Sequence, residues 1–206
     1  PADDGIFEPI FSWKENLSYQ LNTNSKLFTN LAYAERSPDV SEYYGFFLFN
    51  AHDGYDYIGN PELLKEKAWQ AELGFSQAFQ KLNWSLKGYF HHVNNYIIGR
   101  TDSAIDAMTI GANGVRVYTN LTYARLAGFE SNLNYAFTKS WAILATAQYT
   151  YGSEDNGEPL PLIAPLQARF MLSWTNKNWY ANTEVQWANA QNRVNQNFGD
   201  SPTPAY

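Results

Sequence analysis

Apolar and polar residues alternate along most of the chain with a period of two. Residues 69–76 are typical: the side chains at 69, 71, 73 and 75 are apolar, and three of the four between them are polar. Such alternation predicts β-strands with one apolar and one polar face. No stretch keeps helical spacing for more than two turns. The pattern predicts eight strands, at about 12–22, 26–36, 67–78, 82–99, 117–136, 140–151, 166–175 and 178–189.

The connections between these strands fall into two alternating length classes. An up-and-down meander places alternate connections at opposite ends, so one end of the sheet has only short turns. Short periplasmic turns and long extracellular loops are the rule for outer-membrane barrels. Several strands also exceed the roughly 10 residues needed to cross a membrane at a tilt. The pattern therefore predicts an all-β fold, an antiparallel up-and-down transmembrane β-barrel, with long connections at 37–66, 100–116, 152–165 and from 190 onward.

The aromatic content and the polar faces favour the same fold. Phe, Trp and Tyr make up 17% of the residues, and Trp141, Trp174 and Trp179 lie close to short turns. This placement suits an interfacial girdle, although tryptophans in the core of a β-sandwich are the alternative. The polar faces would leave many unsatisfied groups in a dry interior. We therefore expect the apolar faces to contact lipid and the polar faces to contact water or protein.

Composition excludes several classes of function. The chain has no cysteine, which excludes disulfides, thiolate metal sites and cysteine nucleophiles. Its net charge of −6 argues against a nucleic-acid partner. It contains no nucleophile elbow, zinc-protease helix or phosphate loop, so we do not expect an enzyme. Acidic residues are concentrated in the long connections, where they could bridge lipopolysaccharide through divalent ions.

Four segments, taken in order, resemble the barrel of TonB-dependent outer-membrane receptors. The first two follow one another within the longest connection and its flanking strands, and the last two lie in the second half of the chain. They are residues 34–38 (AERSP) with Glu42 and Tyr43; residues 59–63 (GNPEL) with Glu66; Asn120, Ala124, Gly128 and Glu130; and residues 149–151 (YTY) with Pro159, Leu160 and Pro165.

The resemblance implies a 22-stranded barrel around an N-terminal plug. Residues 1–206 would then be a fragment of the barrel domain, about eight of its strands, with the plug not present. It also implies a bacterial outer-membrane location, with lipid and lipopolysaccharide around the barrel. The receptor would take up a metal or metal complex without an intrinsic cofactor, driven by the TonB energy-coupling protein acting on the missing plug. Residues 164–169 and 191–194 look closest to copper receptors, but iron–siderophore receptors share much of the pattern.

The connection at 37–66 is rich in aromatic residues and also contains a histidine. An aromatic loop at the mouth of a barrel could stack on an aryl siderophore or hold a metal complex. These rings could equally pack the loops against one another. The ligand-binding candidates are Tyr43, Tyr44, Phe47, His52, Tyr55 and Tyr57.

Candidates for direct metal binding are weaker. His91 and His92 are neighbours on a strand and point to opposite faces, so they cannot chelate one ion together. Met171 falls on the polar face of its strand, and a thioether suits Cu(I), as it does for Met108. We retain Met171 and His91 as metal-ligand candidates.

Two other functions remain open. A small, complete eight-stranded barrel for adhesion or structure would pair its last strand with its first. A soluble carbohydrate-binding β-sheet protein, or a soluble β-sheet enzyme, would have a polar exterior and would pack its apolar faces together.

Overall fold

The computed structural model describes residues 9–206, which are almost entirely β-structure. The predicted fragment's first eight residues lie outside the described part. The elements, in chain order, are β1 (Ser12–Asn22), β2 (Ser25–Arg36), α1 (Val40–Tyr44), β3 (Leu48–Asn50), β4 (Tyr55–Ile58), β5 (Glu66–Phe79), β6 (Leu82–Asn94), β7 (Ile97–Asp102), β8 (Val115–Asn120), β9 (Tyr123–Tyr135), β10 (Trp141–Glu154), β11 (Gln167–Asn176), β12 (Trp179–Ala188) and the 3-10 helix η1 (Gln196–Phe198).

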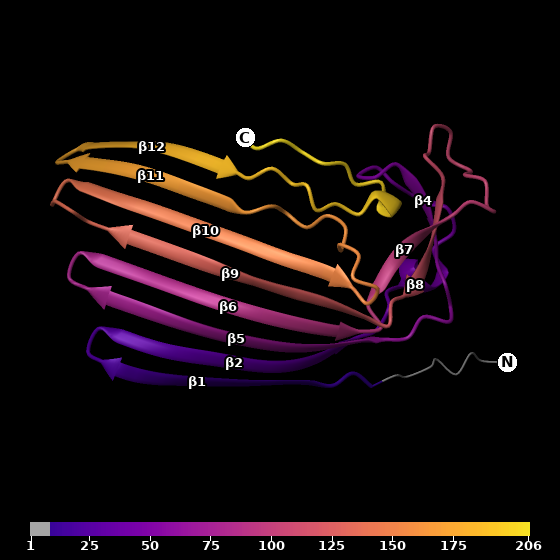
Figure 1. Ribbon diagram of the computed structural model, residues 1–206, viewed down its shortest axis with the longest axis horizontal. Helices are drawn as coiled ribbons and strands as arrows, with labels where there is room; N and C mark the ends of the chain where they lie inside the picture. Colours follow the sequence, from indigo (N-terminus) through magenta and orange to yellow (C-terminus); the bar gives the residue numbers. More distant parts are fainter. Residues whose placement is uncertain (1–8) are drawn as a thin grey trace.

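Eight long strands form one antiparallel sheet in the order β1-β2-β5-β6-β9-β10-β11-β12 (Figure 1). Short turns lie at one end and long connections at the other, as the sequence predicts. Trp141 begins β10 directly opposite Trp174 of β11, at the end with short turns. The all-β, antiparallel meander is therefore confirmed.

The two faces of this sheet differ as the alternation requires. On one face, Leu73 and Phe129 flank Gly88 across three strands, and Leu73 is 65% exposed. On the other face, Lys87 forms ion pairs with Glu130 (3.2 Å) and Glu72 (3.7 Å). No second layer covers the apolar face in the described residues, so the sheet is not half of a dry sandwich. Exposed apolar side chains are what a lipid-facing wall requires.

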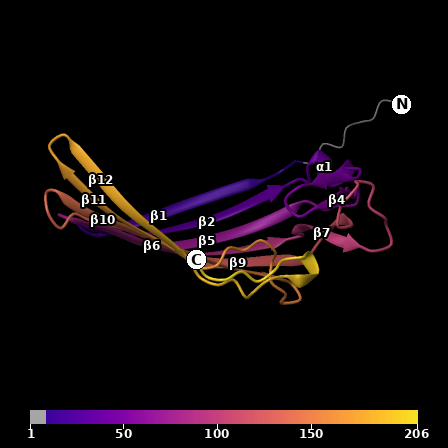
Figure 2. The ribbon, with the colours of Figure 1, turned by 90° about the horizontal axis from the view of Figure 1, so that it is seen from above.

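The sheet is open at both edges. Within residues 9–206, β1 pairs only with β2 and β12 only with β11. Figure 2 shows that the sheet bends along its width, without closing on itself. The first-to-last pairing that a small complete barrel requires is not formed.

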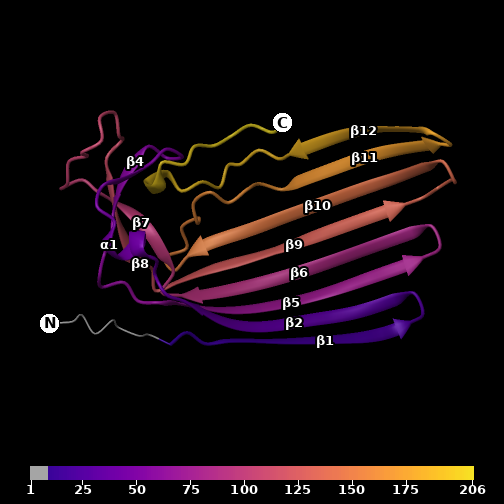
Figure 3. The same cartoon turned by 180° about the vertical axis from the view of Figure 1, so that it is seen from behind.

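Two of the predicted long strands are each divided in two, so the prediction of continuous strands at 82–99 and 117–136 is wrong. Asn95, with φ of 55°, separates β6 from β7, and β8 is separated from β9 after Asn120. The outer pieces turn away and form a second sheet in the order β3-β4-β8-β7, in which β4 and β8 are parallel. Figure 3 shows this sheet at the end with the long connections. The predicted connection at 37–66 thus contains α1, β3 and β4, and the one at 100–116 begins in β7 and ends in β8.

Burial is concentrated at the same end. Ile98, Leu121, Ala124 and Leu160 form a small apolar core where β7 of the second sheet meets β9 of the long sheet. Glu154 is buried beside it, paired with Arg100 and accepting a hydrogen bond from Asn195 Nδ2 (2.9 Å). None of the helices in residues 9–206 is long and apolar enough to cross a membrane.

Candidate functional site

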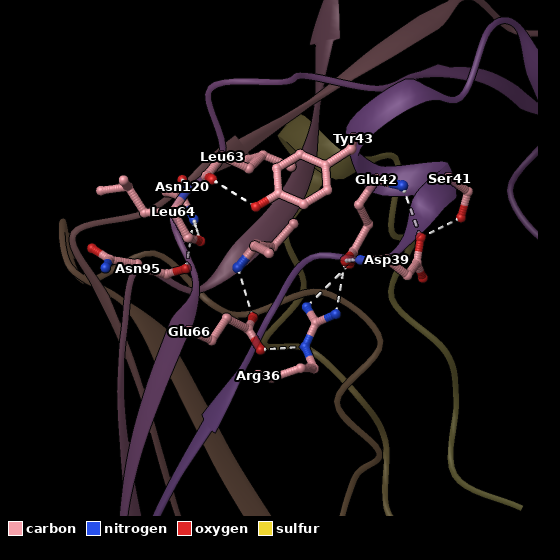
Figure 4. Close-up of polar contacts among 11 residues, drawn as sticks. Arg36, Asp39, Ser41, Glu42, Tyr43, Leu63, Leu64, Glu66, Asn95 and Asn120 are labelled. Carbon is pink, nitrogen blue, oxygen red and sulfur yellow. Dashed lines mark hydrogen bonds and ion pairs between the residues drawn. The ribbon is translucent and has the colours of Figure 1, made fainter. Parts of the chain in front are cut away.

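The loop end begins where β2 ends, at Arg36 (Figure 4). Its Nε donates to Glu66 Oε2 (2.7 Å) and its Nη1 to Glu42 Oε2 (2.7 Å). Glu66 Oε1 accepts a further hydrogen bond from the Ile97 backbone N–H (2.8 Å). Both carboxylate side chains are 13% exposed. Arg36 and Glu66 therefore connect β2, α1, β5 and β7 at one point.

Helix α1 is fixed to this point by a capping box. Asp39 Oδ1 accepts from the Glu42 N–H (2.8 Å), and Glu42 Oε2 accepts from the Asp39 N–H (2.8 Å). These bonds satisfy two backbone donors that a helix start otherwise leaves free. The hydrogen bond from the Ser41 hydroxyl, with that from the Glu42 N–H, lowers the pKa of Asp39. Glu42 thus serves both the helix cap and the Arg36 ion pair.

Residues 59 and 60 lie directly against α1. Gly59 N–H donates to Gly45 O (2.7 Å) and Asn60 N–H to Glu42 O (2.8 Å). A Cβ at position 59 would come within 2.6 Å of the backbone of Tyr43, Tyr44 and Gly45, so only glycine allows this approach. Asn60 Nδ2 also reaches Tyr118 O of β8 (3.2 Å).

The Asn120 side chain, at the point where β8 gives way to β9, binds backbone groups just before β5 and where β6 gives way to β7. Its Nδ2 donates to Asn95 O (2.7 Å) and Leu64 O (3.0 Å), and its Oδ1 accepts from the Leu64 N–H (2.8 Å) (Figure 4). We name Arg36, Asp39, Glu42, Asn60, Glu66 and Asn120 the motif junction, because all but Asp39 belong to the segments on which the family resemblance depends. The junction sets how the loops leave the barrel wall.

A second group of polar residues surrounds Arg116 of β8, which is fully buried. Arg116 Nη1 donates to Asp53 Oδ2 (2.8 Å) and Tyr57 Oη (3.2 Å). Its guanidinium carbon lies 4.0 Å from the ring centroid of Tyr55 and 3.6 Å from that of Phe198, whose carbonyl accepts from Nη2. We name Asp53, Tyr55, Tyr57, Arg116 and Phe198 the arginine cluster.

Two acidic groups of this region have shifted pKa values. Burial, together with the hydrogen bond to Asp53, raises the pKa of Tyr57 to about 12. Burial also raises the pKa of Asp56, but the hydrogen bonds from Thr109 and from the Met108 N–H outweigh it, so the pKa is lowered overall. Asp56 Oδ2 accepts the Met108 and Thr109 N–H groups at 2.9 and 2.8 Å, which fixes the 103–112 loop to β4.

The six predicted ligand-binding residues fall into two groups: four lie between α1 and the turn after β3, and two belong to the arginine cluster. Tyr43 and Tyr44 are on α1 with ring centroids 5.6 Å apart, and Tyr44 is 69% exposed. Phe47 packs on Phe46 and has a left-handed backbone (φ 52°). His52 is exposed in the turn after β3.

Tyr55 and Tyr57 belong to the arginine cluster. Tyr57 is only 7% exposed and donates to Asp53 Oδ2 (2.6 Å). In this conformation the ring of Tyr57 holds loops together, and Tyr44 and His52 face solvent.

The two metal-ligand candidates lie far apart. Both are on the polar face: His91 is opposite Gln70, and Met171 Sδ receives Asn182 Nδ2 at 3.7 Å. The register across β11, β10, β9 and β6 brings Met171 level with Asn83, about 26 Å along β6 from His91. They cannot bind one ion together. Residues 9–206 contain no group of three or more His, Cys, Asp or Glu side chains arranged for a metal.

Sequence reasoning missed the arginine cluster and the cap of α1. The Asp39-x-x-Glu42 spacing is a helix-start signal that could have revealed α1. No local signal links Arg116 to Phe198, which are 82 residues apart in the chain.

Residues 5–206 match the family model described as "TonB dependent receptor-like, beta-barrel". Among solved structures, the copper transporter OprC superposes with a TM-score of 0.80 at 23% identity, over 96% of this chain and 30% of OprC. A ferric enterobactin receptor mutant from Pseudomonas aeruginosa (PfeA) in complex with enterobactin gives 0.75 at 20% identity, over 95% and 31%. The siderophore receptor PirA from Acinetobacter baumannii gives 0.72 at 18% identity, over 95% and 33%.

The chain thus spans about a third of the length of these proteins. Proteins of the matched family are transporters of the bacterial outer membrane and not enzymes. A match over nearly the whole chain, together with the lipid-facing meander, leads to one conclusion. The chain belongs to the TonB-dependent receptor family and corresponds to part of its outer-membrane β-barrel.

Proposed function

We propose that this chain is a fragment of a receptor that imports a metal or metal complex, either copper or an iron–siderophore. Residues 1–206 supply part of the barrel wall and several extracellular loops. The plug and the remaining strands lie outside this sequence, and the TonB protein acts through the plug. The polar face of the sheet, with the Lys87 ion pairs, then faces the plug or water.

The observation that carries this proposal is the group of structured loops at one end of a lipid-facing sheet, residues 37–65, 95–122, 155–166 and 189–206, which we name the loop platform. The motif junction and the arginine cluster hold the loops, so aromatic side chains stay exposed above the barrel wall. Tyr44 is 69% and Phe46 72% exposed, and His52 is exposed nearby in sequence. Fixed aromatic surfaces suit an aryl chelate, and an imidazole suits a metal ion.

In this proposal the ligand contacts Tyr43, Tyr44, Phe47 and His52, and Tyr55 and Tyr57 position them through the arginine cluster. Tyr57 acts through Asp53, with which it shares a 2.6 Å hydrogen bond. Both cargo classes have structural support. OprC superposes over 96% of the chain, and the enterobactin-bound PfeA mutant over 95%.

The test uses the full-length receptor in a bacterial strain that lacks competing receptors. Cell-associated copper and iron are measured by mass spectrometry, with copper salt or an iron–catecholate supplied, in the presence and absence of TonB. We expect one cargo to accumulate only when both receptor and TonB are present. Equal accumulation with and without the receptor, for both cargoes, would contradict the proposal.

Variants then test the ligand surface. Tyr44→Ala and His52→Ala should lower uptake without changing the amount of folded receptor in the membrane. Tyr19→Ala is the matched control, since Tyr19 is similarly exposed (68%) but lies on the lipid-facing side of β1. Unchanged uptake in both loop variants would remove these residues from the ligand surface and leave the import proposal standing.

A further inference from the structure

Three basic side chains gather on the lipid-facing side of the sheet, near its loop end. The register places Trp69, His92 and Arg125 side by side on β5, β6 and β9. Lys67 is two residues beyond Trp69 and therefore points to the same side. Directly opposite residues of antiparallel strands share a face, so these side chains are close neighbours. We name Lys67, His92 and Arg125 the basic patch.

The two permanent charges of the basic patch have no carboxylate partner within the described residues. Arg125 Nε contacts only His92 Nδ1 (3.5 Å), and its guanidinium lies 4.6 Å from the Tyr123 ring centroid. By contrast, each of these other basic residues is in an ion pair: Arg36, Lys65, Lys87, Arg100, Arg116 and Arg169.

Two acidic residues on neighbouring segments, Glu35 and Asp155, have other partners. Glu35 is opposite Lys67 but binds Lys65 Nζ (2.8 Å) and the Tyr33 hydroxyl (2.7 Å). Asp155 accepts the Thr122 N–H (3.0 Å). The basic patch therefore carries uncompensated positive charge.

The height of the patch on the barrel wall identifies its surroundings. Phe79 lies at the short-turn end of β5, ten residues from Trp69. This spacing corresponds to a distance of about 33 Å along the strand. A strand tilt of about 40° reduces this to about 25 Å, the height of the apolar band of an outer-membrane barrel. The lipid-facing positions in between are uncharged on all three strands; they include Leu73, Phe75, Leu86, Phe90, Phe129 and Leu133.

The basic patch thus lies where the outer-leaflet headgroups begin. We propose that it binds the phosphate groups of lipopolysaccharide. Lys67 and Arg125 are charged donors for phosphate oxygens, and the guanidinium can bind two of them at once. The ring of Trp69, which is 55% exposed, would lie below against the acyl chains. This binding is independent of the imported cargo.

The test compares full-length receptor with the double variant Lys67→Gln/Arg125→Gln. Each is placed in nanodiscs of phosphatidylethanolamine that contain either lipid A or dephosphorylated lipid A, and the lipid retained by the protein is quantified by native mass spectrometry. Lys139→Gln/Lys177→Gln is the matched control, because it removes two charges from short turns at the opposite end of the sheet.

We expect the unmodified receptor and the control to retain lipid A over its dephosphorylated form. The double variant should retain it about tenfold less, as expected when charge-assisted hydrogen bonds are lost. Equal retention by the double variant, or no preference for the phosphorylated lipid, would overturn the proposal. Millimolar inorganic phosphate should not displace the lipid; full displacement would assign the site to free phosphate instead.

Discussion

The Arg116 guanidinium is stacked on the ring of Phe198, with 3.6 Å between its carbon and the ring centroid. The ring of Tyr55 covers the cation at 4.0 Å, and Arg116 is fully buried. A desolvated cation on an aromatic face contributes about 2 kcal/mol. This contact fixes the segment after β12 to the second sheet.

Replacing Phe198 with Ala should release that segment. We expect the free energy of unfolding of the loop platform to fall by about 2 kcal/mol and residues 189–206 to become sensitive to protease. Limited proteolysis followed by mass spectrometry measures the effect. Phe46→Ala is the control, because Phe46 is 72% exposed and packs only on Phe47 among the described ring contacts. Protection equal to that of the unmodified protein would show that the stacking is dispensable.

Replacing Arg36 with Gln should loosen the motif junction. Glu42 and Glu66, each 13% exposed, would lose their shared cation, at a cost of about 1–3 kcal/mol. We expect faster amide hydrogen exchange in α1 and around residues 59–66. Lys177→Gln, in a short turn, removes the same charge and should leave exchange there unchanged. An equal response to both substitutions would point to net charge as the cause.

Gly128→Ala should prevent normal folding of the barrel wall, whereas Gly88→Ala should be tolerated. A Cβ at 128 would lie 2.2 Å from Tyr149 O and 2.5 Å from the Tyr89 hydroxyl, but one at 88 meets nothing closer than 3.8 Å. Heat-modifiable migration on a denaturing gel reports the folded fraction. Similar folded fractions for the two variants would contradict the predicted steric difference.

Tyr57 makes the arginine cluster sensitive to alkaline pH. Its pKa is raised to about 12, so the folded state holds this proton more tightly than the unfolded state, whose tyrosine titrates near 10. The resulting stabilisation is complete below pH 10 and is lost as pH rises from about 10 to 12. Burial also raises the pKa of Tyr96 and Tyr118, so ultraviolet titration should show several late-ionising tyrosines, and one fewer in Tyr57→Phe. An identical titration curve for the two proteins would exclude the raised pKa.

The barrel wall could be predicted from the sequence because its pattern is local. Alternation in segments such as 69–76 fixes which side chains share a face, and the lengths of the connections fix the meander order. The segments around Arg36, Gly59 and Asn120 identified the family, and the structure gives each a physical role at the motif junction. Arg36 joins two carboxylates, Gly59 allows a close backbone approach, and the Asn120 side chain binds backbone groups.

The second sheet could not be predicted in the same way. Strand-forming residues continue past Asn95 and Asn120, so composition gives no reason for a break there. Side-chain to backbone hydrogen bonds between distant segments interrupt the strands. Three-residue β3 is too short to have a period, and the parallel pairing of β4 with β8 joins residues about 60 apart. Aromatic composition predicted a ring-rich loop, but only the fold distinguishes exposed Tyr44 from buried Tyr57.

The apolar core lies where the second sheet meets the barrel wall, while the wall itself exposes its apolar side chains, so the chain depends on two solvents. The hydrophobic effect in water stabilises the loop platform, and the surrounding hydrocarbon stabilises the hydrogen-bonded long strands. Detergent exchange and urea should therefore act on different parts of the molecule. In a receptor removed from its bilayer, the loops at the extracellular end would stay folded after the long strands had begun to separate.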